Sequence, residues 1–402
     1  MRTQTWGRLL LSQQEFGLSV EEATKLPWAV ARVATVRQIA SSVEIQIGPY
    51  AGQLYVRPGL TIQVEELVPG TVAACLELSH SGRRQDAQPG SGKPLVDPTL
   101  VVAQRFVDRC SRFLERGPLK EYLPHAEAVQ RPRGRINIGA TVGGPWARGR
   151  DSIIVCEWRR LTDDTPLNRI LLAAAVRAER IINRHVGISR SARALLLILS
   201  GAELVPNPDS EIPPAAFNES STEVLSLART LISGVPWTSA GLPAGPVSCW
   251  INVERVFEEA VYAVCRKKSS GRPVYKGAGS GTKLFHALPG EPPPQFKSAE
   301  PDVVIEGLGG RLVLDAKYRR GLDDSQLYQL VAHAGAFEAH AAALIGPALD
   351  GSPSIRRLGR IASGCTIDVI SVDPSSVRSI EAGISRWVDA ASRRTEPDQR
   401  IS

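Results

Sequence analysis

The sequence is 402 residues long, which at about 150 residues per domain predicts two or three domains. It carries 48 Lys and Arg against 41 Asp and Glu, a net charge of +7, with 43% hydrophobic and 22% charged residues. This ordinary globular composition excludes a wholly disordered chain, a fibrous repeat and a disulfide-stapled miniprotein. Because the sequence contains no run of eighteen apolar residues and no cleavable N-terminal signal pattern, we expect a soluble, cytoplasmic protein with no membrane partner.

Six cysteines are scattered along the chain without a close pair: Cys75, Cys110, Cys156, Cys249, Cys265 and Cys365. Metal ribbons and redox dithiols need two thiolates within a few residues of each other. We therefore expect reduced and mostly buried thiols.

Residues 1–93 predict a β-rich N-terminal domain. Residues 43–47 alternate between apolar and polar, and residues 54–56 lead through a Pro-Gly turn into a second strand at 60–64. The stretch at 81–93 is rich in Gly, Ser, Pro and charge without apolar periodicity, which is typical of a linker.

Residues 94–245 predict a mainly helical middle region. Residues 100–114 have apolar residues at helical spacing. A second helix is expected to begin at Thr165-Pro166, capped by Asp163 or Thr165, with Asn168 and Arg169 securing the turn.

Residues 246–402 alternate between helical and strand patterns and predict an α/β domain. An amphipathic helix is expected after residue 252, followed by strands at 303–305 and 311–318 and by a helix from about Ser325. The overall fold class is therefore multidomain, with a β-rich N-terminal domain, a mainly helical middle region and a C-terminal α/β domain.

The chemistry is expected in a β-hairpin formed by the two strands of that last domain. A Gly-rich turn separates the strands, and we expect Glu306 to face Arg311 across it. This register places Asp302 directly opposite Asp315, with their Cβ atoms roughly 4.5–5.5 Å apart. Strand alternation puts Lys317 on the same face as Asp315.

Two facing carboxylates repel each other unless a proton or a cation lies between them. Acidic oxygen ligands suit Mg²⁺, with Mn²⁺ as an alternative. A lysine beside such an ion can position the attacking water and stabilise the charge on a phosphorane. The hairpin therefore predicts metal-assisted hydrolysis of a phosphodiester.

Pro301-Asp302 followed by Asp315-Ala316-Lys317 resembles the PD-(D/E)xK nuclease superfamily. The resemblance implies a C-terminal PD-(D/E)xK endonuclease domain with Asp302, Asp315 and the Ala316 carbonyl as metal ligands and Lys317 as the residue that acts on the nucleophile. The preceding helix offers Glu258 as a third acid, both catalytic and metal-binding. Glu254 lies slightly nearer the apolar face of that helix and is a rival for this role.

Gln329 and His333 lie at i and i+4 on the following helix and so share a face. The pair resembles the Gln-x-x-x-Tyr element of one nuclease branch, which implies a DNA contact for Gln329. His333 replaces the usual tyrosine, so a DNA contact and a core or surface histidine are both open interpretations.

The Gly-rich segment at 277–283 suggests DNA backbone contacts through Lys276 and Lys283. It does not match a phosphate-binding loop, because Thr282 separates Gly281 from Lys283 and Leu284 replaces the required Ser or Thr. We therefore expect any nucleotide-driven motor to be supplied by another chain.

Several motifs over residues 100–340 resemble the McrC family, the nuclease subunits of modification-dependent restriction systems. They are Arg-Gly-Pro-Leu-Lys-Glu-Tyr at 116–122, Arg-Gly-Arg-Ile at 133–136, Cys-Glu-Trp-Arg at 156–159 and the stretch at 162–171. The resemblance implies an antiviral defence complex with a McrB-like AAA+ GTPase hexamer that recognises modified double-stranded DNA. It also implies that the N-terminal and middle regions dock on the ring and stimulate it.

The leading hypothesis is thus a Mg²⁺-dependent DNA endonuclease subunit of a McrBC-like complex. A non-catalytic adaptor that activates an AAA+ ring through a degenerate nuclease fold is the alternative. A stand-alone repair nuclease is a third interpretation, which the long non-nuclease portion of the chain disfavours. The DNA modification, the partner's nucleotide and the stoichiometry stay open.

Overall fold

The computed structural model of the protein describes residues 1–79, 97–205, 208, 219–234, 248–284, 298–307, 310–321, 323–350 and 352–393. Within these residues the chain forms two compact units. The first holds 1–79, 97–102, Gly234 and 248–393, and the second holds 103–205, 208 and 219–233. The predicted linker at 81–93 and both predicted domain boundaries, after residues 93 and 245, lie outside the described residues, so the predicted domain division stays a prediction.

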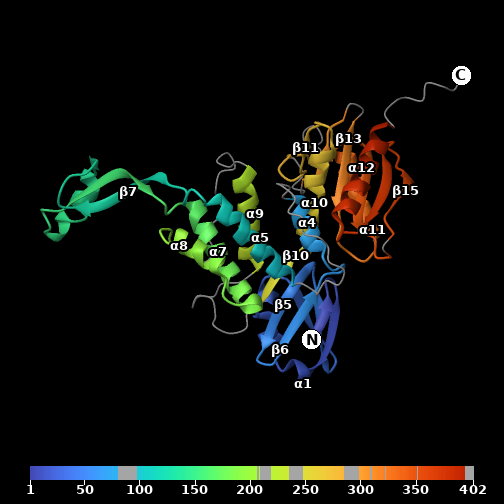
Figure 1. Ribbon diagram of the computed structural model, residues 1–402, viewed down its shortest axis with the longest axis horizontal. Helices are drawn as coiled ribbons and strands as arrows, with labels where there is room; N and C mark the ends of the chain where they lie inside the picture. Colours follow the sequence, from blue (N-terminus) through green and yellow to red (C-terminus); the bar gives the residue numbers. More distant parts are fainter. Residues whose placement is uncertain are drawn as a thin grey trace, which may run out of the picture. The chain divides into compact units, whose positions relative to one another are not determined.

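Two small sheets form the N-terminal part of the first unit, as the β-rich prediction requires (Figure 1). One has the order β2 (Arg8–Ser12), β4 (Ser42–Ile47), β3 (Ala34–Ile39). The other has the order β1 (Arg2–Gln4), β6 (Leu60–Glu65), β5 (Tyr50–Arg57), β10 (Cys249–Asn252). Strand β10 pairs antiparallel with β5, so a strand from the far C-terminal part of the chain completes the N-terminal sheet.

Helix α4 (Thr71–Ser79) packs against helix α10 (Val253–Lys268). Three shorter helices instead share one core with the strands of these sheets: α1 (Gln13–Phe16), α2 (Val20–Thr24) and α3 (Pro27–Val30). Phe16 and Trp28 are completely buried in this core together with the inward residues of β4 and β6. Alternation along β4, where Val43, Ile45 and Ile47 are buried, produces the one-sided apolar face.

A six-stranded mixed sheet forms the C-terminal part of the first unit. Its order is β11 (Val274–Tyr275), β12 (Val303–Ile305), β13 (Arg311–Ala316), β14 (Ala339–Pro347), β16 (Thr366–Val372), β15 (Ser354–Arg360). Strands β13, β14 and β16 are parallel, and the outer pairs are antiparallel. The central strands read as continuous apolar runs because helices cover both of their faces.

Helices α10 (Val253–Lys268), α11 (Asp324–Ala336) and α12 (Val377–Arg393) cover this sheet. Helix α11 packs in a cluster that includes Ile367 of β16. Helix α12 lies against Ile370 and Val372, where Gly383 approaches both side chains. Because Ile367 and Ile370 point to opposite faces of β16, α11 and α12 lie on opposite sides of the sheet.

The second unit contains the helices of the middle region. They are the greater part of α5 (Pro98–Phe113), α6 (Ile138–Gly143), α7 (Pro166–Val186), α8 (Arg190–Ile198) and α9 (Glu219–Gly234), with a 3₁₀ turn at Trp146–Arg148. Thr165 caps α7 by accepting a hydrogen bond from the Asn168 N–H (3.2 Å), and Pro166 occupies its first turn, as predicted.

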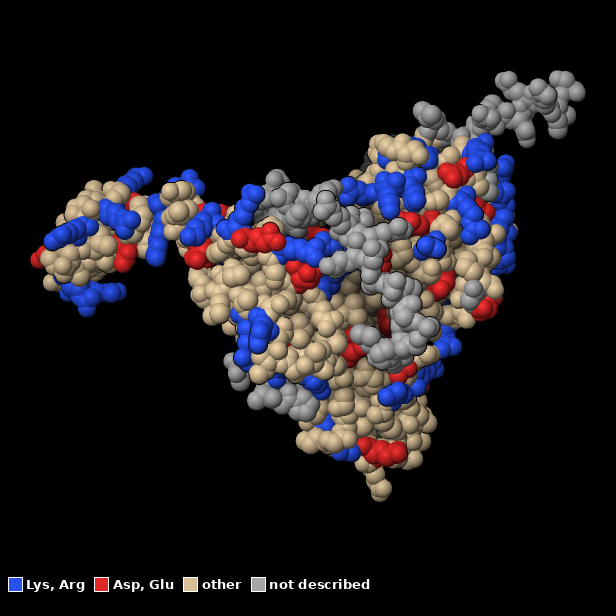
Figure 2. Space-filling view, in the orientation of Figure 1, with Lys and Arg blue, Asp and Glu red and all other residues tan. Residues whose placement is uncertain are grey.

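The middle region also contains a three-stranded sheet that the sequence did not predict. Its order is β7 (Glu121–Val129), β9 (Ile154–Thr162), β8 (Arg135–Ile136). The sheet extends away from helices α7 and α8 of the same unit (Figure 1). Most of its side chains are exposed, and they include Arg135, Arg159 and Arg160; Lys and Arg side chains appear blue over this part of the chain in Figure 2.

All six cysteines are free and buried, as expected. Among the described residues, no helix combines the length and the apolar character needed to cross a lipid bilayer.

Candidate active site

The β12–β13 hairpin has the predicted register. Val303 pairs with Leu314, and Ile305 pairs with Leu312. One step further along both strands, the main-chain N–H of Asp302 donates to Asp315 Oδ1 (3.2 Å). In return the main-chain N–H of Ala316 donates to Asp302 Oδ2 (2.7 Å). Each aspartate carboxylate therefore accepts a hydrogen bond from the main chain of the opposite strand. The two carboxylates face each other, as the sequence predicts.

Asp315 is buried below the surface, with 1% of its area exposed. Its second carboxylate oxygen, Oδ2, lies 3.1 Å from Nδ1 of His333 on α11. His333 is itself buried, so its role is a contact to Asp315 from within the core. Gln329, one turn earlier on α11, is exposed to solvent, so the two residues that share a helix face lie in different environments.

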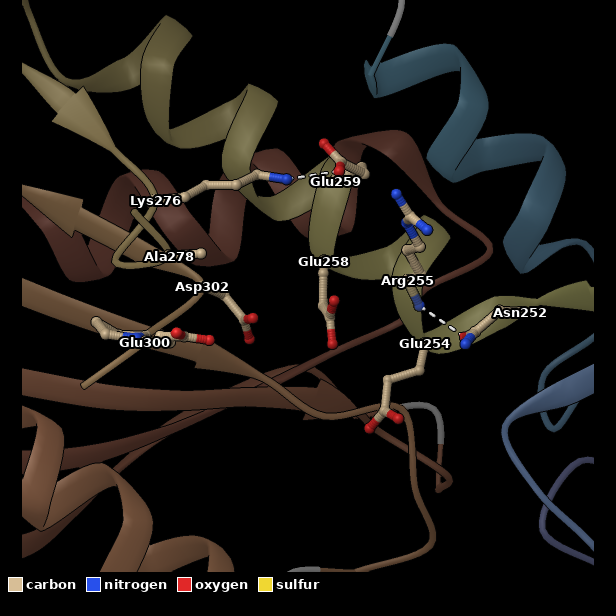
Figure 3. A pocket seen from close by; sticks show the side chains of 10 residues that line it. Asn252, Glu254, Arg255, Glu258, Glu259, Lys276, Ala278, Glu300 and Asp302 are labelled. Carbon is tan, nitrogen blue, oxygen red and sulfur yellow. Dashed lines mark hydrogen bonds and ion pairs between the residues drawn. The ribbon is translucent and has the colours of Figure 1, made fainter. Parts of the chain in front are cut away.

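A pocket of about 370 Å³ lies beside the hairpin. It is lined by Asn252, Glu254, Arg255, Glu258, Glu259, Lys276, Ala278, Glu300, Pro301 and Asp302. Figure 3 shows the carboxylate of Glu258 beside that of Asp302, with Glu254 one turn earlier on α10. The pocket is therefore acidic, with carboxylates supplied both by the hairpin and by the helix.

Helix α10 brings its acids to the pocket because its apolar residues face the opposite way. Asn252 caps the helix by accepting a hydrogen bond from the Arg255 N–H (3.0 Å). The apolar stripe of this amphipathic helix is buried and includes Val253, Val256, Phe257, Ala260, Val261 and Val264. The stripe leaves Glu254, Glu258 and Glu259 on the side that lines the pocket.

The pocket carboxyls are hard to ionise. Burial, and then the neighbouring charge of Asp315, raise the pKa of Asp302 to about 6. Burial, followed by the charges of Asp302 and Glu254, raises the pKa of Glu258 to about 8. Near neutral pH the pocket carboxyls therefore favour binding a proton, and a cation in this pocket would compete with that proton.

Lys317 follows β13 directly and is half-buried, and its main-chain N–H donates to the Ile345 carbonyl (2.8 Å). Its positive charge lowers the pKa of Asp302 and of Glu258, in opposition to burial. Lys317 is therefore the cation that lowers the pKa of both acids most. It is not among the described residues that line the pocket.

Both candidates for the third acid line the pocket. Burial raises the pKa of Glu254, and its Oε1 lies 3.7 Å from Arg319 Nε, which opposes the shift. The charge of Asp302 raises the pKa of Glu258, the charge of Glu254 raises the pKa of Asp302, and Glu258 lies beside Asp302 in Figure 3. The arrangement favours Glu258 as the third acid, with Glu254 held by an arginine.

The predicted DNA-binding lysines lie in different surroundings. Lys276 lines the pocket, where its Nζ is 2.5 Å from Oε1 of Glu259 and lies over the Tyr262 ring. Lys283 is exposed and forms an isolated bridge with Ser298.

Sequence reasoning missed the pocket residues Glu259 and Glu300. Glu300 lies two positions before Asp302 and was detectable from strand alternation.

The donor set suits a hard divalent cation. Asp302, Asp315, Glu258 and the Ala316 carbonyl all offer oxygen, the ligand atom that Mg²⁺ prefers. Among the described residues, no three or more His, Cys, Asp or Glu side chains are close enough to hold a metal ion as they stand. Mg²⁺ commonly uses only one or two carboxylates and keeps several waters, so the Asp302–Asp315 pair fits such an ion.

Comparison with known proteins gives a family match. The family model described as "McrBC 5-methylcytosine restriction system component" matches residues 73–347. No curated protein matches the chain.

Two solved structures are similar in part. One is a refined half-complex from the tetradecameric assembly of Thermococcus gammatolerans McrB AAA+ hexamers with bound McrC. It has 15% identity and a TM-score of 0.48, over 97% of this chain and 100% of that chain. The other is the cryo-EM structure of the Thermococcus gammatolerans McrBC complex, with 13% identity and a TM-score of 0.37, over 67% and 88% of the two chains.

Proposed function

Because the chain belongs to the family of McrBC 5-methylcytosine restriction system components, we propose that it is the DNA endonuclease subunit of such a complex. The matched residues include the whole hairpin and helix α10. The observation that carries the proposal is the Asp302–Asp315 pair, fixed by reciprocal backbone hydrogen bonds at the edge of an acidic pocket. This arrangement supports a PD-(D/E)xK nuclease domain.

Each residue of the site has a separate proposed role. Asp302, Asp315 and the Ala316 carbonyl are the proposed ligands of Mg²⁺, with Mn²⁺ as a substitute and Glu258 as a further ligand. When bound, such an ion supplies Lewis-acid activation of a water and of the scissile phosphate. Lys317 orients the attacking water and stabilises the negative charge that grows on the phosphate oxygens. Burial and the charges of Asp302 and Glu254 raise the pKa of Glu258, so positive charge gained by the pocket favours its ionised form.

Lysine and glutamine side chains can bind the phosphates of a DNA backbone. We propose that Lys276, Lys283 and Gln329 contact DNA, with Lys276 at the pocket itself. Lys276 must then exchange its Glu259 partner for a DNA phosphate, an anion of the same unit charge.

The proposed partner is a McrB-like AAA+ GTPase hexamer that reads modified double-stranded DNA. The β7–β9–β8 sheet supports docking by the middle region, because it exposes large apolar side chains such as Tyr122, Ile136 and Leu161 beside its arginines. We propose that the N-terminal and middle regions bind the ring and stimulate its nucleotide hydrolysis.

The test is cleavage of modified and unmodified plasmid DNA by this chain, co-expressed with the AAA+ protein encoded beside it, with Mg²⁺ and GTP or ATP. We expect Lys317→Gln to abolish nucleotide-dependent cleavage while leaving nucleotide hydrolysis intact. Lys283→Gln is the matched control, because it removes an exposed lysine of the same unit and is expected to weaken cleavage only modestly.

Full cleavage by Lys317→Gln would contradict the nuclease assignment. Stimulated nucleotide hydrolysis without any cutting by the wild-type complex would instead identify the chain as an adaptor with a degenerate nuclease fold.

A further inference from the structure

Trp6 lies in the turn between β1 and β2 with an unusual backbone conformation. Its φ is 64°, in the left-handed region that bulky residues avoid. The turn is closed by a hydrogen bond from the Gly7 N–H to the Gln4 carbonyl (2.7 Å), and Trp6 N–H donates to the Gly48 carbonyl (3.1 Å). A Cβ on residue 7 would lie 2.6 Å from that same Gln4 carbonyl oxygen, so only glycine fits there. The turn thus holds a strained tryptophan in one place.

The Trp6 side chain contacts Tyr318 and Arg319, just beyond strand β13. Its indole Nε1–H donates to the main-chain carbonyl of Tyr318 (2.6 Å). Its ring lies under the guanidinium of Arg319, with 4.2 Å between the guanidinium carbon and the ring centroid. Tyr318 and Arg319 immediately follow Lys317, so Trp6 restrains the backbone directly beyond the proposed catalytic lysine.

Arg319 also pairs with an acid that lines the pocket. Its Nε lies 3.7 Å from Oε1 of Glu254, whose side chain is 14% exposed and lines the pocket. The guanidinium is therefore placed between an aromatic ring of the N-terminal region and an acid of the proposed active site. Both contacts favour the same orientation of the guanidinium, because arginine stacks on a ring face and pairs with a carboxylate through its edge.

A second contact fixes the same strand end from another side. The phenol oxygen of Tyr318 accepts a hydrogen bond from the Val68 N–H (2.9 Å) and lies 3.1 Å from Thr71 Oγ1. Val68 lies between β6 and α4, and Thr71 is the first residue of α4. The N-terminal region thus binds both the main chain and the side chain of Tyr318.

We propose that Trp6 and Arg319 are positioning residues through which the N-terminal β-rich region sets the placement of Lys317 and Glu254 in the pocket. The inference rests on the proposed function, because it assigns to the docking region a regulatory link to the nuclease site. A displacement of the β1–β2 turn on docking would pass to the backbone beyond Lys317 and, through Arg319, to Glu254.

The test compares Trp6→Phe with Trp28→Phe in the full chain. Trp6→Phe keeps an aromatic ring under Arg319 but removes the hydrogen bond to Tyr318. Trp28→Phe removes an equivalent bond, from Nε1–H to the Tyr55 carbonyl (2.9 Å), within the N-terminal core. The first readout is amide hydrogen exchange of residues 315–320 and 252–256 in the chain alone. The second is the rate of DNA cleavage in the complex with its AAA+ partner.

We expect Trp6→Phe to speed exchange in both segments by about tenfold and to lower kcat by a similar factor at unchanged KM, whereas Trp28→Phe leaves both segments unchanged. Exchange that matches the wild type, or that rises equally in both variants, would overturn the link whether or not the complex cleaves DNA. Faster exchange in Trp6→Phe with no cleavage by the wild-type complex would uphold the link and refute the nuclease function.

Variants of Arg319 test the contact between Arg319 and Glu254. Arg319→Lys keeps a cation near Glu254, and Arg319→Gln does not. We expect Arg319→Lys to retain most of the cleavage that Arg319→Gln loses. Equal losses in the two variants would contradict a role for the pairing with Glu254.

Discussion

The acidic pocket has two walls, the β12–β13 hairpin and helix α10, and they hold their carboxylates in different ways. On the hairpin wall, Asp302 and Asp315 accept hydrogen bonds from each other's strand, and His333 contacts the second oxygen of Asp315. On the helix wall, side-chain cations hold Glu254 and Glu259, while the pKa of Glu258 rises to about 8. The hairpin therefore orients its carboxylates through backbone hydrogen bonds. On the helix, the charge of each acid depends on the side chains around it.

The hairpin thus controls the position of its carboxylates, whereas the surroundings of the helix control the charge of its carboxyls. A backbone N–H that points at a carboxylate fixes its position while the strand is folded, even though burial also raises the pKa of Asp302. A carboxyl on a helix face, held only by side chains, changes its protonation as the pocket gains or loses positive charge. We infer that the hairpin defines where a cation binds and that the helix adjusts how strongly it binds.

Removing the hairpin charge is expected to have the largest effect. Asp302→Asn keeps an oxygen that can accept the hydrogen bond of the Ala316 N–H but loses the proposed ligand charge. We expect cleavage by the complex to fall by about 10²–10³-fold, in the range typical of a lost electrostatic stabiliser. The melting temperature should not fall, because the variant also removes the repulsion from Asp315.

Single-turnover cleavage and thermal unfolding of the same preparation measure the two effects of this variant. Glu306→Gln, which alters an acid at the other end of the hairpin, is the control. Cleavage above a tenth of the wild-type rate would exclude Asp302 as a metal ligand.

The support behind Asp315 is expected to have the next largest effect. His333→Phe fills a similar space but leaves Asp315 Oδ2 without the contact that the imidazole makes in the core. An unsatisfied buried group costs about 1–3 kcal/mol, so the free energy of unfolding should fall by that amount. Denaturant unfolding measures it, with the exposed Gln329→Ala on the same helix expected to change stability by less than about 0.5 kcal/mol. Equal stability of the two variants would mean that the histidine does not support Asp315.

The hairpin was predictable because its strands are joined by a short turn, so register follows from local pattern. Contacts between distant segments were not predictable from the sequence. The His333–Asp315 contact depends on how α11 packs on the sheet, and Trp6 reaches Tyr318 from 312 residues away. The pairing of β10 with β5 likewise joins segments that no local pattern connects.

The β7–β9–β8 sheet was missed for a different reason. Its strands are largely exposed on both faces, so they lack the alternation of apolar and polar residues that identifies a half-buried strand. The prediction of a mainly helical middle region therefore captured the buried helices, whose apolar stripes are clear, and omitted the exposed strands.

The helix wall predicts a dependence of stability on pH. Glu258 has an ordinary pKa near 4.5 when unfolded and about 8 when folded, so the folded state binds more protons between these values. The free energy of unfolding should therefore decrease as the pH rises from about 5 to 8 in the absence of divalent cations. Asp302, whose pKa rises to about 6, adds to the decrease at the lower end.

Chemical denaturation of the chain in EDTA at several pH values tests this dependence. Glu258→Gln should flatten the decrease, and added Mg²⁺ should oppose it by binding the ionised carboxylates. The neighbouring Glu259→Gln is the control. A decrease as steep in Glu258→Gln as in the wild type would assign the protons to another group.

The smallest effect is expected at the rim of the helix wall. The Glu259–Lys276 ion pair has more than a third of each side chain exposed, and exposed pairs of this kind contribute about 0–1 kcal/mol. Glu259→Gln should therefore leave the free energy of unfolding within about 1 kcal/mol of the wild type. It also frees Lys276, so KM for DNA should fall about two- to threefold at low salt while kcat is unchanged, because the freed cation adds one phosphate contact. A double variant with Lys276→Gln should lose this gain, and a gain that persists without Lys276 would exclude the lysine as the DNA contact.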